Sequence, residues 1–449
     1  MKGLLIEGGR LVDPSQSIDR TAGLLIVDGV VAAIDPPAES LPGDLQRIDA
    51  RGCIVAPGLV DLATELREPG REEDEMIETG VAAAVAGGYT SILCAANTDP
   101  PIDSPGTVEL VRQKAAAANR ARVYVIGCVS KGRNGETMAE LGLLSEAGAV
   151  AFSDSPRPLP NSALLRRALD YCRMFNRPIF DRPGVPELSH GGVMHEGRVS
   201  LVLGLSGLPT EAEDLAVARD VRLAEATGGR LHVGPVSTMG AIDMLRRVKS
   251  RGVAVTASAC PHNLALHLGL TDESLRWFDA RYKVHPPLRS QRHIETLRDS
   301  IVDGTIDALQ SGHMPRADEK KMDDLDSSPF GQSSLETSLA VAITELVHTG
   351  LIDWLTLVRR MSTAPAEIAG IPAGSLKNGA AGDVVIIDPA KRWTVDPTLF
   401  ASHCRSTPLA GVDLYGKVRT TIVGGDVKFE DSLSEAVAHS PLETPAPCW

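Results

Sequence analysis

The sequence predicts an α/β fold, namely a (β/α)8, TIM-like barrel with a small β-sandwich formed from both ends of the chain. Three observations favour this architecture. Short apolar runs alternate with Ala-, Glu- and Leu-rich stretches through the middle of the chain, and strand-like texture occurs at both ends. The length of 449 residues suits a large barrel with a smaller appended domain.

Eight apolar runs in the central part of the chain have the length and composition of buried parallel strands. They are residues 55–62, 90–94, 122–127, 149–153, 178–181, 230–233, 253–256 and 306–309. Helix-like segments lie between most of them, for example 75–86 and 211–226. Eight such units are the number in a (β/α)8 barrel. A doubly wound open sheet is the competing fold, but no glycine-rich phosphate loop follows the first strand, which disfavours it.

The two ends of the chain resemble each other in texture. Apolar runs at 4–6 and 24–27, followed by the turn pair Asp28-Gly29, predict short strands and a hairpin. Residues 383–388 and 418–425 repeat this texture near the other end. The expected division is 1–54 and 373–429 for the two parts of the sandwich, 55–372 for the barrel, and 430–449 for a disordered tail rich in Ser, Pro, Ala and Glu.

Composition excludes several classes of protein. A net charge of −13 argues against a nucleic-acid surface, and no apolar stretch approaches the ~20 residues of a membrane span. The N-terminus becomes polar too early for a signal peptide, so we expect a cytoplasmic protein. The seven cysteines are scattered and never form a CxxC pair, which predicts reduced thiols without a structural zinc.

A distinctive motif follows the first expected barrel strand, at the strand end where barrel enzymes carry their chemistry. Residues 57–70 read PGLVDLATELREPG, and residues 97–100 read NTDP. These segments resemble the signature PGxxDxHxHxREPG and the NTxP loop of the dihydroorotase family of cyclic amidohydrolases. Further motifs resemble that family in the same order, at 191–197, 207–213, 236–238, 261–262, 286–289, 303–307, 379–388 and 424–425. The resemblance therefore spans nearly the whole chain up to the tail.

The resemblance implies a zinc enzyme that interconverts N-carbamoyl-aspartate and dihydroorotate. Zinc lowers the pKa of a bound water to near 7 and polarises the amide carbonyl, so the metal needs lone-pair donors at fixed places. In the family's HxH motif two histidines at i and i+2 project to one face of a strand. In this chain the same two positions are Ala63 and Glu65.

The other family positions have also changed. By the resemblance, the acidic or modified-lysine ligand corresponds to Asp154, the next histidine to Arg182 and the following histidine to Pro235. The catalytic aspartate corresponds to Gly312. Four positions are therefore lost, Ala63, Arg182, Pro235 and Gly312, and two possible residual metal ligands remain, Glu65 and Asp154. We accordingly expect no catalytic residue and no metal or other cofactor, because nothing is left to activate a water molecule.

Four polar residues around the expected barrel mouth correspond to the substrate-binding region of the family. Arg67 and Asn97 match residues that hold the substrate's carboxylate, His285 stands where the family usually has Asn, and His313 follows the lost aspartate. These residues either form a vestigial ligand site or stabilise loops. We also consider that Arg182 takes the place of the metal and pairs with both Glu65 and Asp154.

The remaining polar residues leave further interpretations open. His232, His262 and His313 either form a degenerate metal site or are hydrogen-bonded core residues. The acidic run at 72–75 is expected to be the solvated first turn of a helix.

The losses narrow the resemblance to a non-catalytic, dihydroorotase-like protein that assembles with aspartate transcarbamoylase in some bacteria. This resemblance implies a pseudoenzyme of pyrimidine biosynthesis that forms homo-oligomers and is a structural partner of the aspartate transcarbamoylase catalytic subunit. The competing hypothesis is an active, metal-dependent dihydroorotase. In that case Glu65, Asp154 and histidines hold zinc or a substitute in an altered site.

Overall fold

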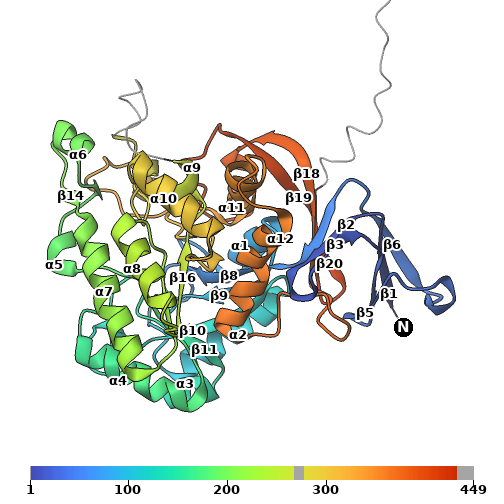
Figure 1. Cartoon of the computed structure of the whole chain (residues 1–449), viewed down its shortest axis with the longest axis horizontal. Coiled ribbons are helices and arrows are strands. Elements are labelled where there is room, and N and C mark those ends of the chain that lie inside the picture. Colours follow the sequence, from blue (N-terminus) through green and yellow to red (C-terminus); the bar gives the residue numbers. More distant parts are fainter. Residues whose placement is uncertain (1, 267–277, 432–449) are drawn as a thin grey trace, which may run out of the picture.

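The computed structural model describes residues 2–266 and 278–431 and is organised around a parallel, eight-stranded barrel sheet (Figure 1). Its strands, in order around the sheet, are β8 (Leu59–Thr64), β9 (Tyr89–Cys94), β10 (Arg122–Gly127), β11 (Ala149–Phe152), β12 (Ile179–Asp181), β15 (Leu231–Val233), β16 (Val255–Ala259) and β17 (Ala308–Leu309). All eight apolar runs contribute a strand, which confirms the predicted barrel. The backbone N–H of Ser311 donates to Asp61 Oδ1 (2.6 Å), and this bond links the last strand to the first.

The first apolar run, at residues 55–62, does not form one strand as predicted. It divides at Gly58 into β7 (Ile54–Pro57), which pairs with β18 (Val384–Thr394) of the terminal sheet, and β8, which pairs with β9. A Cβ at position 58 would lie 2.1 Å from the Thr90 side chain, so the two sheets meet here at a distance that only glycine allows. Since both halves are buried and apolar, the sequence pattern does not show the break.

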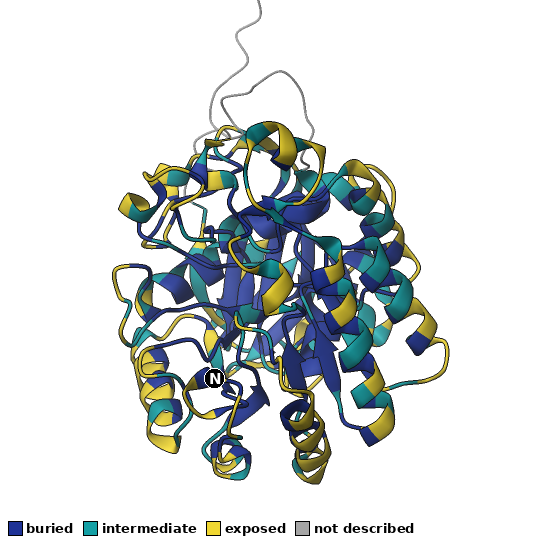
Figure 2. Ribbon diagram, turned by 90° about the vertical axis from the view of Figure 1, so that its left-hand side faces the viewer, coloured by how far each residue is buried: buried dark blue, intermediate teal, exposed yellow. Residues whose placement is uncertain are grey.

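Helices cover the outside of the barrel, with their polar faces exposed and the strands buried inside (Figure 2). They include α1 (Ile77–Ala86), α2 (Pro105–Ala118), α3 (Leu141–Glu146), α4 (Ser162–Cys172), α7 (Thr210–Thr227), α8 (Met239–Lys249), α10 (Gln291–Val302) and α11 (Leu335–Ala342). The barrel interior is filled by apolar side chains such as Val60, Leu62 and Phe180, against which α13 (Ala364–Ala369) packs. The barrel is a packed core, so only its ends offer room for a site.

Both ends of the chain build the accessory β-structure beside the barrel, as predicted (Figure 1). One sheet has the order β5-β4-β1-β6 and the other β20-β19-β18-β7-β2-β3. Besides β7 and β18, these sheets contain β1 (Gly3–Glu7), β2 (Arg10–Asp13), β3 (Ile18–Thr21), β4 (Leu24–Val27), β5 (Val30–Ile34), β6 (Leu45–Asp49), β19 (Asp413–Val423) and β20 (Asp426–Glu430). Their shared core joins Leu4 and Ile26 from the N-terminus to Ile386 and Ile422 from the C-terminal part. Neither end could bury its apolar face alone.

One hairpin of the sandwich lies where the turn pair Asp28-Gly29 predicts it. Asp28 and Gly29 have φ of 48° and 81° and connect paired Val27 and Val30, so the predicted tight hairpin is confirmed. Of the predicted tail, Glu430 ends β20, and residues 432–449 lie outside the described residues. No helix in the described ranges is long and apolar enough to cross a membrane.

Candidate functional site

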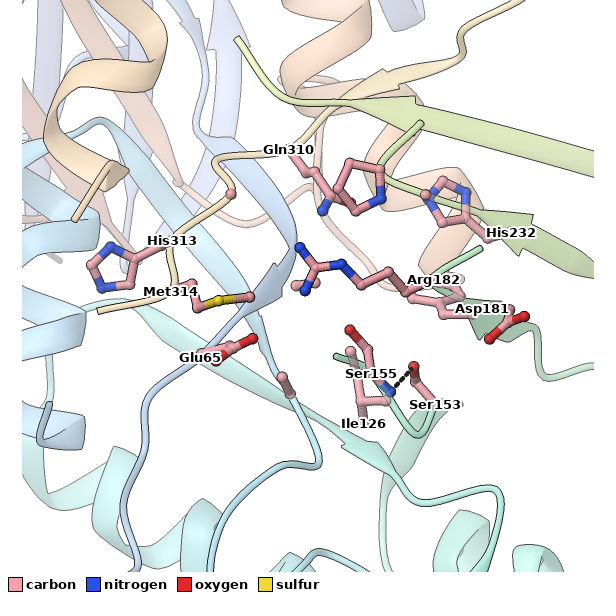
Figure 3. Close-up of a pocket in the computed structure, with 16 residues that line it drawn as sticks. Glu65, Ile126, Ser153, Ser155, Asp181, Arg182, His232, Gln310, His313 and Met314 are labelled. Carbon is pink, nitrogen blue, oxygen red and sulfur yellow. Dashed lines mark hydrogen bonds between the residues drawn. The ribbon is translucent and has the colours of Figure 1, made fainter. Parts of the chain in front are cut away.

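The candidate site lies at the carboxyl ends of the barrel strands, where the altered family positions come together (Figure 3). The pocket there is lined by Ala63 and Glu65 at and after the end of β8, Arg182 after β12, Pro235 after β15 and Gly312 after β17. The strands thus bring five of the six changed positions around one hollow. Asp154, the sixth, lies between two further lining residues, Ser153 and Ser155.

Glu65 does not face the pocket as a free carboxylate. It forms an ion pair with Arg67, in which Oε2 and Nη2 are 2.5 Å apart and both side chains are almost fully buried. Burial by itself would raise the pKa of Glu65, but the guanidinium groups of Arg67, Arg316 and Arg182 outweigh it and lower that pKa. Burial lowers the pKa of Arg67 to about 10, against the attraction of Glu65. Both members of the pair therefore stay charged at neutral pH.

Arg182 projects into the pocket towards the side on which Glu65 lies (Figure 3). Its side chain is buried, with 5% of the residue's surface exposed, and Nη2 donates to the carbonyl oxygen of His285 (2.9 Å). Nε is buried without a hydrogen-bond partner. Burial lowers the pKa of Arg182, and attraction by Glu65 opposes this shift. A guanidinium thus occupies the part of the pocket in which the resemblance implies a metal ligand.

Asp154 is committed elsewhere, and the expected pairing of Arg182 with both carboxylates is wrong. Among the described residues Arg182 forms an ion pair with neither of them, and Glu65 attracts it only from a longer distance. Asp154 Oδ1 accepts from the backbone N–H groups of Val129 (2.9 Å) and Ser130 (3.1 Å), and Oδ2 accepts from the Ser130 hydroxyl. Arg133 binds the carbonyl oxygen of the same residue. Burial raises the pKa of Asp154, in part offset by these hydrogen bonds. Its carboxylate fastens the loop after β10 to the end of β11.

Gly312 leaves no room for the aspartate that the resemblance implies there. Its φ is +71°, and a Cβ would lie 2.8 Å from Cys260 Sγ and 2.9 Å from His262 Cε1. An L-residue at this position would be strained in its backbone and crowded by its neighbours. The surrounding residues therefore pack in a way that leaves no space for an aspartate at position 312, so restoring this one side chain would also require its neighbours to move.

His313 is turned towards Glu75 and away from Arg182 (Figure 3). Its Nδ1 accepts from the backbone N–H of Ser334 (3.2 Å), and its Nε2 lies 3.4 Å from Glu75 Oε2. Glu75 also accepts from the Ser402 hydroxyl and from the backbone N–H of His403. Burial opposes ionisation of Glu75, but His313 and these hydrogen bonds lower its pKa. His313 thus stabilises a contact between the barrel mouth and a loop of the C-terminal part.

This arrangement also corrects the prediction for the acidic run at 72–75. Glu72 and Glu73 are exposed, but Asp74 and Glu75 are buried and precede α1, which begins at Ile77. They are anchoring groups for other loops and not a solvated first helical turn.

The other two histidines near strand ends form hydrogen bonds with side chains of neighbouring strands and loops, although among the described residues His262 Nε2 has no partner. His232 hydrogen-bonds through its two ring nitrogens to the hydroxyls of Thr256 and Ser258, both at 2.9 Å. His262 Nδ1 accepts from Gln332 Nε2 (2.6 Å). Burial lowers the pKa of both histidines to about 3, so both are neutral. These two are hydrogen-bonded core residues, the second of the two interpretations considered for them.

Asn97 and His285 are buried polar residues that lie against Glu65 and Arg182, respectively. Asn97 is buried beside Glu65 and contributes to lowering the pKa of that carboxyl, yet neither amide atom of Asn97 makes a hydrogen bond of good geometry. His285 is buried, and burial together with the charges of Arg182 and Arg289 puts its pKa well below the ordinary value. His285 contributes its carbonyl oxygen to Arg182 and keeps a neutral ring.

Arg316 is a residue of the site that the sequence did not single out. Its charge acts on Glu65, while its Nη1 lies 3.4 Å from Asp74 Oδ2. Asp74 also accepts from the backbone N–H of Ala317 (2.9 Å) and from Lys320. Arg316 lies four residues after Gly312, the position of the lost aspartate. This short distance along the chain is the sequence signal that could have identified Arg316 as a site residue.

The residues of this site do not fit a zinc ion. Zinc requires several neutral imidazole, thiolate or carboxylate donors directed at one point. Within residues 2–266 and 278–431, no three His, Cys, Asp or Glu side chains are grouped so that they could hold a metal ion. Glu65 is already paired with a guanidinium, and a second guanidinium projects into the same space and repels a cation.

The pocket is also small. Its free volume is about 30 Å³, which is room for one or two water molecules. By the same measure, a groove between α11 and the strands β18 and β19, lined by Trp393 and Phe400, leaves about 440 Å³. The side chains at the barrel mouth therefore fill most of the space that a ring-shaped substrate would need.

Comparison with known proteins places these observations in a family context. The family model described as "Dihydro-orotase-like" matches residues 52–240, and the model described as "Amidohydrolase family" matches residues 194–428. A protein of Rhodopirellula baltica named "Putative dihydroorotase" is 60% identical over 426 residues, which are 95% of this chain and 92% of that protein. A protein of Syntrophus aciditrophicus named "Dihydroorotase" is 43% identical over 428 residues, 95% and 99% of the two chains. These names give no indication of a non-catalytic protein.

Among solved structures, the L-hydantoinase (dihydropyrimidinase) from Arthrobacter aurescens superposes with a TM-score of 0.84. The match covers 95% of this chain and 96% of that one, at 24% sequence identity. A dihydropyrimidinase from Brevibacillus agri gives a TM-score of 0.80 at 22% identity, over 95% and 94% of the two chains. At these identities the likeness concerns the fold, and it supports the barrel with accessory sheets described above.

Proposed function

Because the chain belongs to the dihydroorotase family of amidohydrolases, we propose that it is a non-catalytic member, which serves pyrimidine biosynthesis as an assembly partner of aspartate transcarbamoylase. The observation that carries the proposal is the guanidinium of Arg182, directed into the pocket in place of a metal ligand. A cationic side chain at this point opposes the binding of zinc.

The chemistry of amide hydrolysis leads to the same proposal. Attack on an unactivated amide needs a water molecule that is made nucleophilic and a group that moves its proton. Ala63 and Pro235 offer no side-chain lone pair, and Gly312 offers no base. Glu65 is held as the partner of Arg67, so its carboxylate is stabilised in the ionised form and is a poor proton acceptor. We derive no catalytic step from these residues.

The proposed partner comes from the resemblance of the sequence to dihydroorotase-like proteins that assemble with the catalytic subunit of aspartate transcarbamoylase. Such a protein acts through its surfaces, so loss of the catalytic groups is compatible with retention of the barrel and its loops. We further propose a homo-oligomer in the cytoplasm. A separate, active dihydroorotase would then supply the missing pathway step.

The second candidate function is dihydroorotase activity with an altered metal site, and the names of the relatives favour it. In this case Glu65 and Asp154 would contribute ligands. Asp154 would have to give up three hydrogen bonds to the loop after β10, and Glu65 would have to leave Arg67. The two candidates therefore differ in a measurable requirement for a metal and for a rearranged mouth.

Three measurements on the full chain separate these functions. The chain is co-expressed with the aspartate transcarbamoylase of its own organism, the complex is examined by size-exclusion chromatography, and metal content and dihydroorotate turnover are measured on the purified protein. We expect co-elution with the transferase, substoichiometric zinc, and turnover equal to the reaction without enzyme, with a dihydroorotase that keeps both histidines of the signature as positive control. Stoichiometric metal with zinc-dependent turnover would establish the second candidate, and failure to co-elute at micromolar concentrations would exclude the scaffold.

A further inference from the structure

The charges at the barrel mouth do not balance. Three guanidinium groups act on one carboxylate, because Arg67, Arg182 and Arg316 all lower the pKa of Glu65. Arg67 is paired with Glu65, and Arg316 is paired with Asp74. Within the described parts of the chain, Arg182 has no carboxylate at ion-pair distance. A buried guanidinium is therefore left without a counter-ion.

The groups around Arg182 do not supply the missing negative charge. Asp181, its neighbour in sequence, directs its carboxylate away from the Arg182 guanidinium (Figure 3). That carboxylate accepts from the Leu159 backbone N–H and lies 3.3 Å from Arg219 Nη2. Cys260 remains a protonated thiol, because burial raises its pKa. His285 is neutral for the reason given above.

Glu213 attracts Arg182 from a distance, but it is already taken. Its carboxylate accepts from the backbone N–H groups of Ser237 (2.6 Å) and Thr238 (2.9 Å), and its Oε2 lies 3.4 Å from Arg289 Nη2. An isolated buried charge is costly unless an ion of opposite sign approaches it.

Donors for such an ion are present at the pocket. Arg182 is more than nine-tenths buried, lines the pocket, and has an Nε without a partner. Ser153 and Ser155 line the same pocket as Arg182 (Figure 3). Ser153 Oγ accepts from the backbone N–H of Ser155 (3.0 Å), so the Ser153 hydroxyl hydrogen is free to donate. The side of the pocket around Arg182 thus presents hydrogen-bond donors.

We propose that the barrel mouth binds a small inorganic anion, chloride or bicarbonate, against Arg182, where the family holds a metal cation. The free volume of about 30 Å³ is enough for a small ion. The change of preference follows from the charges: where a guanidinium replaces one histidine and the other histidines are lost, the pocket attracts an anion in place of a cation. The anion completes a structural centre, and no reaction is attributed to it.

The first test is the melting temperature of the full chain at constant ionic strength. Chloride or bicarbonate replaces, in steps, a bulky sulfonate anion that cannot enter the pocket, so general screening stays the same. We expect a saturable rise of about 2 °C for an ion that binds the folded state only. A rise with both ions indicates a halide-tolerant site, and a rise with bicarbonate alone indicates an oxyanion site. No rise with either ion overturns the proposal.

Variants locate the effect. Arg182→Met is expected to abolish the anion-dependent rise. The control is Arg360→Met. Arg360 is partly buried, donates to two carbonyl oxygens and has an Nε without a partner among the described residues, but it lies near Asp307 at the opposite end of β17. This control is expected to keep the rise. An equal rise in Arg182→Met places the ion elsewhere and contradicts the proposal.

Crystals of the unaltered protein grown in bromide give an independent answer if Arg182→Met does not fold. Anomalous scattering should place bromide about 3.3 Å from an Arg182 nitrogen, and a mouth without a bromide peak would refute the assignment. These readouts do not involve the transferase or turnover. The anion site and the proposed scaffold function can therefore fail separately.

Discussion

Two buried carboxylates, one in the β-sandwich and one at the barrel mouth, show how differently the two regions are built. Asp13 of β2 accepts four hydrogen bonds, from Ser15 N–H and Oγ, Gln16 Nε2 and Leu376 N–H, at 2.7–2.8 Å. Glu65 has a guanidinium partner at 2.5 Å, and around it Arg67, Asn97 and Arg182 keep donor atoms that have no hydrogen-bond partner among the described residues. The sandwich satisfies its buried polar group completely, since that group only joins the two ends of the chain.

The mouth keeps buried polar groups that are only partly satisfied, although each one costs stability. Apolar side chains of similar size would fill the same space at lower cost. Such groups are typical of a site that has, or had, a ligand to complete it. The barrel mouth therefore retains buried charged groups at a cost in stability, whereas the sandwich pairs its buried carboxylate completely.

The largest expected effect tests the buried ion pair. Arg67→Met should destabilise the protein by about 3–5 kcal/mol, because Glu65 would remain charged and buried without its nearest partner. The free energy of unfolding is measured by urea titration. Arg10→Met in the sandwich is the matched control, since Arg10 Nε also lies 2.5 Å from its partner, Asp19, but at the surface. The control should lose at most about 1 kcal/mol. Equal losses would mean that burial does not distinguish the two pairs.

The double variant Glu65→Gln/Arg67→Met separates charge from packing. It removes both charges, so it should recover much of the stability that Arg67→Met loses. A double variant as unstable as the single one would show that Arg67 acts through packing.

The next effect concerns the lost aspartate. Gly312→Asp should cost about 3 kcal/mol, from a positive φ and from the contact of the new Cβ with Cys260 and His262. It should not produce dihydroorotate turnover, because the other donors are still missing. Gly411→Asp is the control: its φ is +77° and no atom lies within 4 Å of the place that a Cβ would take, so it should cost about 1 kcal/mol. Thermal unfolding of both variants and a turnover assay check these outcomes, and activity in Gly312→Asp would contradict the non-catalytic proposal.

The last prediction is a dependence of stability on pH, which comes from a carboxyl group between the barrel and the accessory sheet. Glu336 lies on α11 in the groove that faces β18 and β19, and burial raises its pKa to about 8 from an ordinary 4.5. The folded state therefore holds a proton that the unfolded state releases between pH 4.5 and 8. Its contribution to stability is present below pH 4.5 and is lost as the pH rises towards 8.

Glu336→Gln should flatten this part of the stability profile and leave it unchanged elsewhere. The variant keeps a carbonyl oxygen to accept from the N–H groups of Ala401 and Ser402, as Glu336 Oε1 does. The measurement is the melting temperature of both proteins from about pH 4.5 to about pH 9, a range that spans both pKa values. Parallel curves would show that Glu336 titrates normally.

Much of the site was accessible from the sequence, but its contacts were not. The resemblance singled out Ala63, Glu65, Arg182, Pro235 and Gly312, and the strand pattern predicts that such positions meet at one end of the barrel, because parallel strands bring their carboxyl ends together. The same pattern does not say that Asp154 turns to the loop after β10 while Arg182 turns inward. These choices depend on side-chain rotamers and on partners distant in the chain, which no local motif encodes.

The acidic run and Gly58 show the same limit at the level of the backbone. A cluster of charges predicts solvent, yet Asp74 and Glu75 bind groups from segments more than 200 residues away. A continuous apolar run predicts one strand, yet Gly58 divides it between two sheets. In both cases the residue types suggest the wrong environment, because the contacts of these residues depend on how distant segments pack.

Residue identity and periodicity were enough to predict the alternation of strands and helices and the pairing of the two chain ends. The resemblance of the motifs implied the loss of the family's metal-binding and basic groups at four positions. These properties are local, so they can be read along the chain. The folded molecule alone reveals that Glu65 pairs with Arg67, that His313 lies against Glu75, and that the buried Arg182 has no counter-ion among the described residues. The reason is that burial and electrostatic pairing arise between residues far apart in the chain, when the fold removes them together from water.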